Sequence, residues 1–210
     1  MNSVSTSGVA GIRLPDTEPA LAAKRLSRDA SDRMLYAHAV RSYLFAALLA
    51  RHDGMKVDDE ALYVGCVLHD IGLTPSYADS VKAFEHVSAD VAVDLMGSFG
   101  WSDERNSNLH RAIVLHMAAE VAESESSEAR ALEAGVAFDV TGHRLDDVQE
   151  SARREIFRHF PRGAFKQDFA TIMQREAERK PQCAAAELVK CGLLERIRQA
   201  PFEDMMQVGR

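Results

Sequence analysis

Apolar residues recur at spacings of three and four along nearly the whole chain, and this spacing constrains the fold more than any other feature. Residues spaced in this way lie on one face of an α-helix, as Met34, Phe45 and Leu49 do in the segment before Gly54. The strict alternation that is typical of β-strands is missing from the sequence. The spacing therefore predicts an all-α protein.

Turn and capping residues divide the chain into the expected helices. The expected segments are a short helix from about Thr17 to Leu26, a helix from the N-cap Ser31 to His52, and helices at 58–71, 85–97, 103–118, 126–141, 145–158, 165–179 and 182–198. Residues 1–14 and 74–84 are expected to be loops. We expect residues 1–30 to form an N-terminal extension with a short helix, and residues 31–200 to form a single helical-bundle domain.

Composition narrows the function classes. The chain has 210 residues, enough for one large domain, and its net charge of −7 argues against nucleic acid, which needs a basic surface. Its three cysteines form no CxxC pair, which indicates reduced thiols. The N-terminus lacks the pattern of a signal peptide, and no segment approaches 18 uninterrupted apolar residues. We expect a cytoplasmic protein that acts on a small molecule away from membranes, with self-association left open.

Several ionisable residues lie on the apolar faces of the expected helices. These are His38, the adjacent pair His69 and Asp70, His116 and Asp139, and they come from four separate segments. Burying such groups is costly unless they are satisfied internally. A lone histidine on an apolar face is usually a satisfied core residue, but four helices that do this together indicate a shared partner. One divalent cation would satisfy all of them, with zinc as the first choice and iron or manganese as alternatives.

Cys66 lies one helical turn before His69 and is a candidate ligand, although filling the core is the simpler interpretation. His110 and His116 point about 120° apart on one helix, so a second metal that both histidines share is awkward. The sequence thus favours one metal ion over two.

The order of these residues resembles the H…HD…D signature of the HD-domain metallohydrolase superfamily. Within it, Phe84-Glu85, the segment 112–116, the segment 134–142 and Phe165-Lys166 resemble the cyanamide hydratase-like branch. The resemblance implies an HD-type helical bundle. It also implies that the metal ligands are His38, His69, Asp70 and Asp139.

The same resemblance implies an activity. Asp70 and His116 would be the catalytic residues, with the cation activating water, Asp70 taking its proton and His116 orienting the substrate or donating a proton. The expected reaction is hydration of a nitrile-like carbon, such as that of cyanamide, to give urea. The chain departs from the branch at His86 and Met117, which leaves the substrate in question more than the metal.

Four further residues are candidate substrate contacts. Phe84 and Glu85 match the branch, although Glu85 is also suited to the first turn of a helix. Arg41 and Lys166 would suit an anionic substrate, or would simply be solvated or ion-paired.

Three other functions remain open from the sequence. The first is phosphohydrolysis of a nucleotide or other small phosphate ester, which needs cations around the pocket. The second is a di-iron oxygenase on the same fold, with His86 or His110 as added ligands. The third is a non-catalytic signalling module, which would have no reason to keep buried charges.

Overall fold

The computed structural model describes residues 8–77 and 79–202, and over these ranges it confirms the all-α prediction. The helices are α1 (Glu18–Ala30), α2 (Arg33–His52), α3 (Asp59–Leu68), η1 (Ile71–Leu73), α4 (Phe84–Gly97), α5 (Asp103–Leu115), α6 (Ser127–Thr141), η2 (Leu145–Asp147), α7 (Glu150–His159), α8 (Phe165–Arg179), α9 (Ala184–Lys190) and α10 (Leu193–Gln199). The only strand-like pairing in the described ranges is an isolated bridge between Val9 and Ile12.

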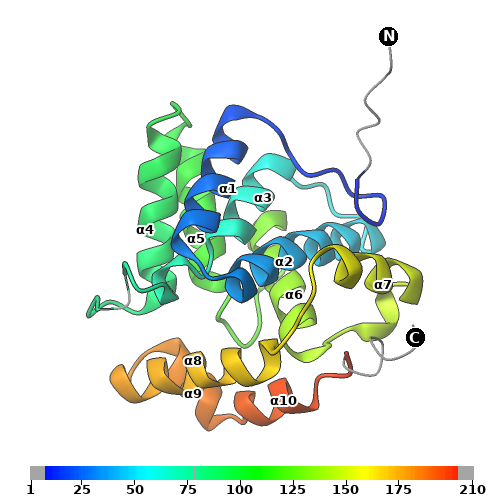
Figure 1. The fold of residues 1–210 in the computed structure, drawn as a ribbon. Helices are drawn as coiled ribbons and strands as arrows, with labels where there is room; N and C mark the ends of the chain where they lie inside the picture. The colour runs from blue at the N-terminus through cyan, green and yellow to red at the C-terminus, as the bar shows by residue number, and fades with distance from the viewer. Residues whose placement is uncertain (1–7, 78, 203–210) are drawn as a thin grey trace.

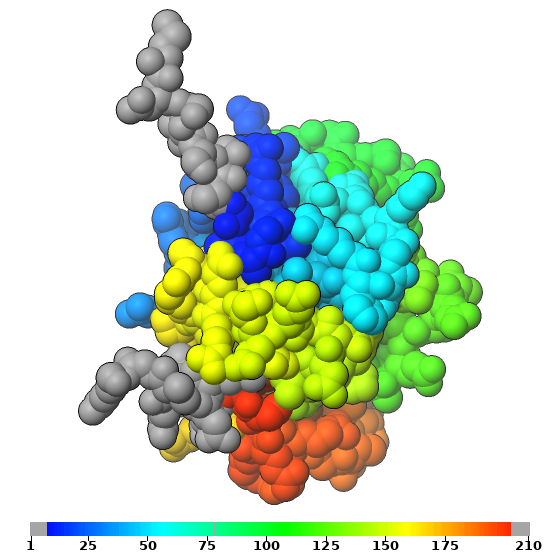
Figure 2. Space-filling model, turned by 90° about the vertical axis from the view of Figure 1, so that its right-hand side faces the viewer, coloured from blue at the N-terminus to red at the C-terminus, as the bar shows by residue number. Residues whose placement is uncertain are grey.

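Helix α2 lies at the centre of the bundle and packs most extensively against α6, with α3 beside it. Figure 1 shows α4 and α5 paired on one side, and α8, α9 and α10 gathered beneath α2 and α6. The face in Figure 2 brings the blue N-terminal segment, the yellow segment around α7 and the red α10 into one continuous surface. Helix α2 contacts α1, α3, α6, α7 and α8, so segments far apart in sequence surround it.

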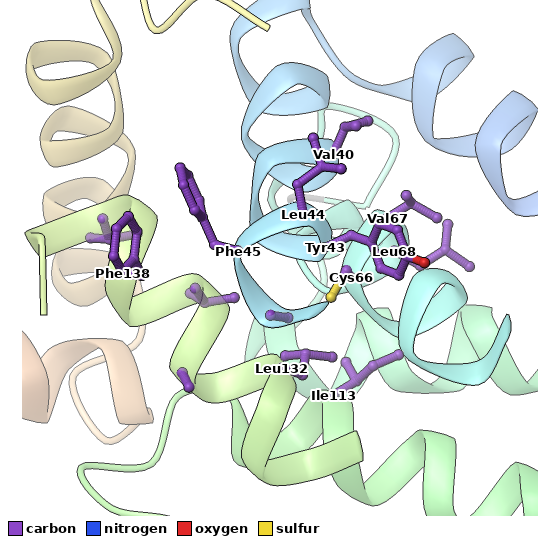
Figure 3. Close-up of a cluster of buried hydrophobic side chains, with 14 of the residues drawn as sticks. Val40, Tyr43, Leu44, Phe45, Cys66, Val67, Leu68, Ile113, Leu132 and Phe138 are labelled. Atoms are coloured by element: carbon purple, nitrogen blue, oxygen red, sulfur yellow. The ribbon is translucent and has the colours of Figure 1, made fainter. Parts of the chain in front are cut away.

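The core is built from the apolar faces that the helical spacing predicts. Figure 3 shows side chains of α2, α3 and α6 directed toward one another in the hydrophobic core. Phe45 of α2 and Phe138 of α6 pack with ring centroids 4.3 Å apart, and both side chains are fully buried. Cys66 is also fully buried within this cluster, as the core-filling interpretation expects.

Several predicted helix boundaries differ from those in the structure. Asp32, and not Ser31, caps α2, because its carboxylate accepts a hydrogen bond from the Leu35 amide. The expected helix at 182–198 is broken at Gly192, which adopts a left-handed conformation with φ +85°. The expected helix at 145–158 is a 3-10 turn followed by α7.

The N-terminal segment is more ordered than the sequence predicts. Residues 1–7 lie outside the described ranges, but Ile12 is buried in the core and α1 packs against α3. Along residues 8–77 and 79–202, no helix combines the length and apolar character needed to cross a membrane.

Candidate metal centre

The site begins where α2 and α6 approach most closely. Gly135 of α6 lies against the backbone of α2, and a Cβ built on it would be 2.4 Å from the Ser42 carbonyl oxygen and 2.6 Å from Ala46 Cβ. Only glycine permits this approach. His38 lies one turn before Ser42 and Asp139 one turn after Gly135, so the close contact brings these two side chains together.

The His69-Asp70 pair follows the last residue of α3, so it lies at the end of the helix and not within it. Gly72 fits against α4, because a Cβ there would be 2.3 Å from the Phe84 carbonyl oxygen. Its amide donates to the Ser88 hydroxyl at 2.9 Å. These contacts hold the segment after the pair against α4 and fix where His69 and Asp70 point.

Hydrogen bonds orient both histidines in the same way. Nδ1–H of His69 donates to the Cys66 carbonyl oxygen at 2.7 Å, and Nδ1–H of His38 donates to the Asp139 carboxylate at 2.7 Å. Because a carbonyl oxygen can only accept, Nδ1 of His69 carries a proton, and in the neutral ring Nε2 presents its lone pair. The Asp139 contact favours the same arrangement at His38.

The three inward-facing atoms converge. His38 Nε2 lies 3.3 Å from His69 Nε2, and Asp70 Oδ2 lies 3.4 Å from His38 Nε2 and 3.2 Å from His69 Nε2. Ligands bound at about 2.0–2.1 Å in a tetrahedron are separated by about 3.3 Å. Asp70 Oδ2 is buried and has no hydrogen-bond partner among residues 8–77 and 79–202. These three residues therefore fit a divalent metal ion with an open fourth position.

The charges around this point also suit a cation. Burial opposes the protonation of His38, but the hydrogen bond to Asp139 and the nearby negative charge of Asp70 outweigh it and raise the pKa of the imidazole. Burial likewise opposes the ionisation of Asp70, yet neighbouring His69 and His38 lower the pKa of that carboxyl. The carboxylates of Asp70 and Asp139 both face the His38 imidazole, so positive charge is favoured there. A divalent cation would supply that charge.

Asp139 lies on the far side of the His38 ring, next to Nδ1. Its Oδ1 accepts from Arg41 Nε and from Arg162 Nη1, both at 2.8 Å, and its Oδ2 accepts from Arg41 Nη2 at 2.8 Å. Burial opposes the ionisation of Asp139, but the guanidinium groups of Arg41 and Arg162 and the His38 hydrogen bond outweigh it. The pKa of this carboxyl is therefore lowered, and the carboxyl is ionised. Its assignment as a direct metal ligand stays a prediction, because this structure shows it orienting His38.

His116 is the C-cap residue of α5, and its ring centroid lies 4.8 Å from that of His69. Its Nδ1–H donates to the Ile113 carbonyl oxygen, so Nε2 carries the lone pair. Nε2 lies 3.7 Å from Asp70 Oδ1. Burial and the neighbouring His69 lower the pKa of His116 to about 3. His116 is therefore a neutral acceptor, and it could donate a proton from Nε2 only after accepting one.

The predicted substrate contacts separate into two groups. Phe84 is buried with its ring 5.6 Å from that of His116, and Glu85 is buried beside it in sequence with a raised pKa caused by burial. Arg41 is fully buried and ion-paired with Asp139, so this arrangement supports the ion-paired alternative and not a substrate contact. Lys166 lines a surface groove between α8 and α10 with Arg175 and Arg198.

The additional histidines lie away from the three converging atoms. His86 is exposed on α4, and the His110 side chain is 40% exposed with Nε2 3.4 Å from Asp90. Met117 is buried next to His116. The placement of His86 and His110 agrees with one metal ion in preference to two.

Two residues next to the candidate centre, Arg162 and Phe169, were not predicted from the sequence. Arg162 belongs to the turn before α8, and its guanidinium carbon lies 4.6 Å from the centroid of Phe165 and 4.7 Å from that of Phe202. Phe169 packs on His38 with ring centroids 5.2 Å apart. Neither has a local signal, because a turn arginine is usually solvated and a helical phenylalanine is usually core.

Comparison with known proteins agrees with this geometry. The sequence profile of the HD domain family matches residues 35–190. Cyanamide hydratase DDI2 and cyanamide hydratase DDI3, both from Saccharomyces cerevisiae (strain ATCC 204508 / S288c), are each 26% identical to this chain over 175 residues, which cover 80% of this chain and 76% of each relative. The resemblance to the cyanamide hydratase-like branch is confirmed.

Family membership and the cluster of His38, His69 and Asp70 together indicate a metal-dependent hydrolase or hydratase. The HD domain match spans well over half of the sequence and contains all of the residues that converge at the candidate centre. The chain therefore belongs to the HD domain family.

Proposed function

We propose that the protein hydrates a nitrile-like carbon, with cyanamide as the simplest substrate and urea as its product. The observation that carries this proposal is the convergence of three ligand atoms, 3.2–3.4 Å apart, beside the unpartnered and buried Nε2 of His116. Such a site would hold one divalent cation, with zinc preferred for its N/O ligand set and spacing. The two cyanamide hydratases support the choice of substrate.

A divalent cation held by His38, His69 and Asp70 would lower the pKa of a water molecule from 15.7 toward about 7 and so provide a nucleophile at neutral pH. Asp70 uses Oδ2 for this cluster and presents Oδ1 toward His116. Oδ1 is therefore the carboxylate oxygen that can accept a hydrogen bond from water. This hydrogen bond would direct a lone pair of the water oxygen at the substrate carbon.

His116 supplies the proton relay. Its Nε2 faces Asp70 Oδ1, so it is placed to take up the proton of the attacking water and return it to the substrate nitrogen. Water adds across the C≡N bond: oxygen bonds to carbon, a proton bonds to nitrogen, and the isourea tautomerises to urea. No leaving group is needed.

The buried cluster of Asp139, Arg41 and Arg162 acts on the metal site indirectly, through His38. Asp139 holds the His38 proton on Nδ1, and the two guanidinium groups keep Asp139 ionised and fixed. This is the carboxylate–histidine arrangement that orients metal-binding imidazoles. Asp139 and its arginines are thus positioning residues for His38.

Phosphohydrolysis is the less favoured alternative, because a phosphate ester needs cations directed at the site. The basic side chain nearest in sequence to His38, Arg41, is buried against Asp139. Lys166 lines a groove whose other residues belong to α8 and α10 and include neither His116 nor any of the three converging ligands.

The direct test is to load the protein with zinc, iron or manganese, incubate it with cyanamide, and quantify urea. We expect urea formation that is lost in His69→Ala and retained in His52→Ala, whose side chain is 50% exposed on the surface. Absence of urea with every metal, together with hydrolysis of a nucleoside monophosphate, would overturn the proposal in favour of phosphohydrolysis.

A further inference from the structure

A cavity of about 320 Å³ lies between α6, the C-terminal helices and the segment that follows α5. Apart from His116, the buried part of its wall is apolar and includes Met117, Val136, Val140, Phe169, Met173 and Leu193. Its exposed residues include Ala119, His143 and Arg196, which mark the side open to solvent. The cavity thus combines a polar mouth with an apolar interior, as small-molecule sites do.

Two residues connect this cavity to the candidate metal centre. His116 lines the cavity, and its Nε2 lies 3.7 Å from Asp70 Oδ1. Phe169 also lines the cavity, and its ring packs on His38. A molecule whose reactive carbon reaches His116 would therefore place its remaining atoms in the cavity.

The cavity is much larger than cyanamide requires. A cavity of about 150 Å³ is enough to hold benzene, and this one has about twice that volume. Cyanamide has three non-hydrogen atoms and no apolar group. We propose, building on the proposed hydration, that the substrate is a nitrile-like compound that carries an apolar alkyl or aryl substituent, which binds in the cavity between His116 and Met173.

The proposed reaction keeps the same atom balance. For an N-alkylcyanamide, the oxygen of water bonds to the nitrile carbon, both of its protons end on the former nitrile nitrogen, and the product is the N-alkylurea. The substituent takes no part in the bonding changes. It contributes binding energy, and the apolar wall excludes water from its surface.

The first test is a homologous series, which holds the electronic character of the reacting group nearly constant. We measure kcat/KM of the metal-loaded full chain for N-methyl-, N-ethyl-, N-propyl- and N-butylcyanamide. Each buried methylene contributes enough transfer free energy for roughly a fourfold increase. We therefore expect kcat/KM to rise by up to about fourfold per carbon until the cavity is filled.

The second test uses variants that reduce the cavity. Ala137→Leu projects from α6 into the cavity, and Ala119→Leu reduces it at the exposed mouth, where folding is less sensitive. The matched control is Ala122→Leu, in an exposed loop residue that does not line the cavity. We expect the preference for butyl- over methylcyanamide to fall at least tenfold in either cavity variant and to be unchanged in the control.

A binding measurement separates this inference from the proposed function. Calorimetric titration with N-butylurea reports on the cavity without requiring turnover. Binding that is weakened by Ala119→Leu and kept by Ala122→Leu supports the cavity assignment, even if no cyanamide is hydrated. If cyanamide is hydrated, but kcat/KM falls with each added carbon and N-butylurea does not bind, the inference is overturned while the proposed function stands.

Discussion

Glu133 offers a perturbation whose size can be worked out from the structure. It lies on α6 in the wall of the cavity, one turn before Val136 and Ala137. Burial raises its pKa from 4.5 to about 7 and outweighs the opposing effect of Arg144. Glu133→Gln keeps the size of the side chain and removes the ionisation.

The shift of about 2.5 pH units corresponds to roughly 3 kcal/mol, at about 1.4 kcal/mol per unit. Because solvent reaches part of the side chain, we expect about 1–3 kcal/mol. The sign follows from linkage: Glu133 is protonated in both states below pH 4.5, so its full contribution to stability is present there. As the pH rises toward 7, the unfolded chain releases the proton and the folded protein holds it, so stability falls.

The assay is thermal unfolding of wild type and Glu133→Gln at pH 4.5 and pH 8. We expect nearly equal melting temperatures at pH 4.5 and a higher melting temperature for the variant at pH 8, by about 2–4 °C for each kcal/mol. Glu123→Gln, in an exposed loop carboxylate, is the matched control and should show no difference at either pH. A Glu133→Gln protein that is no more stable than wild type at pH 8 would refute the reasoning about burial.

Two further predictions concern the framework of the centre. Gly135→Ala should destabilise the protein by about 1–3 kcal/mol in urea unfolding, because the added Cβ would collide with α2. The control Gly97→Ala places its Cβ in open space and should stabilise α4 by about 0.5–1 kcal/mol. Equal effects of the two substitutions would contradict the argument that α2 and α6 approach closely at Gly135. Asp139→Asn leaves Arg41 and Arg162 buried without their carboxylate and should cost about 3–5 kcal/mol, and a near-neutral result would show that the ion pairs are dispensable.

The fold class and the nucleus of the site followed from the sequence because both depend on local spacing. Helical periodicity places His38 on the apolar face of α2, and His69 and Asp70 follow an apolar run, so their burial could be predicted. Helix ends were less predictable. The acceptor that caps α2 is Asp32 in place of its neighbour Ser31, and both residue types are good caps.

The parts that could not be predicted depend on long-range contacts. Arg162 reaches Asp139 across 23 residues of sequence, and its guanidinium also lies over the aromatic rings of Phe165 and Phe202. The cavity is formed by side chains from the segment after α5 and from α6, α8, α9 and α10, so no single segment carries its pattern. The break at Gly192, which separates α9 from α10, also positions part of its wall.

The most direct test of the central claim is the metal content of freshly purified protein, measured per chain by elemental mass spectrometry. We predict one equivalent of a divalent metal in wild type and in His110→Ala, whose side chain is partly exposed beside Asp90. His69→Ala removes one of the three converging atoms and should lose the metal. Full metal occupancy in His69→Ala would contradict the assignment of this centre.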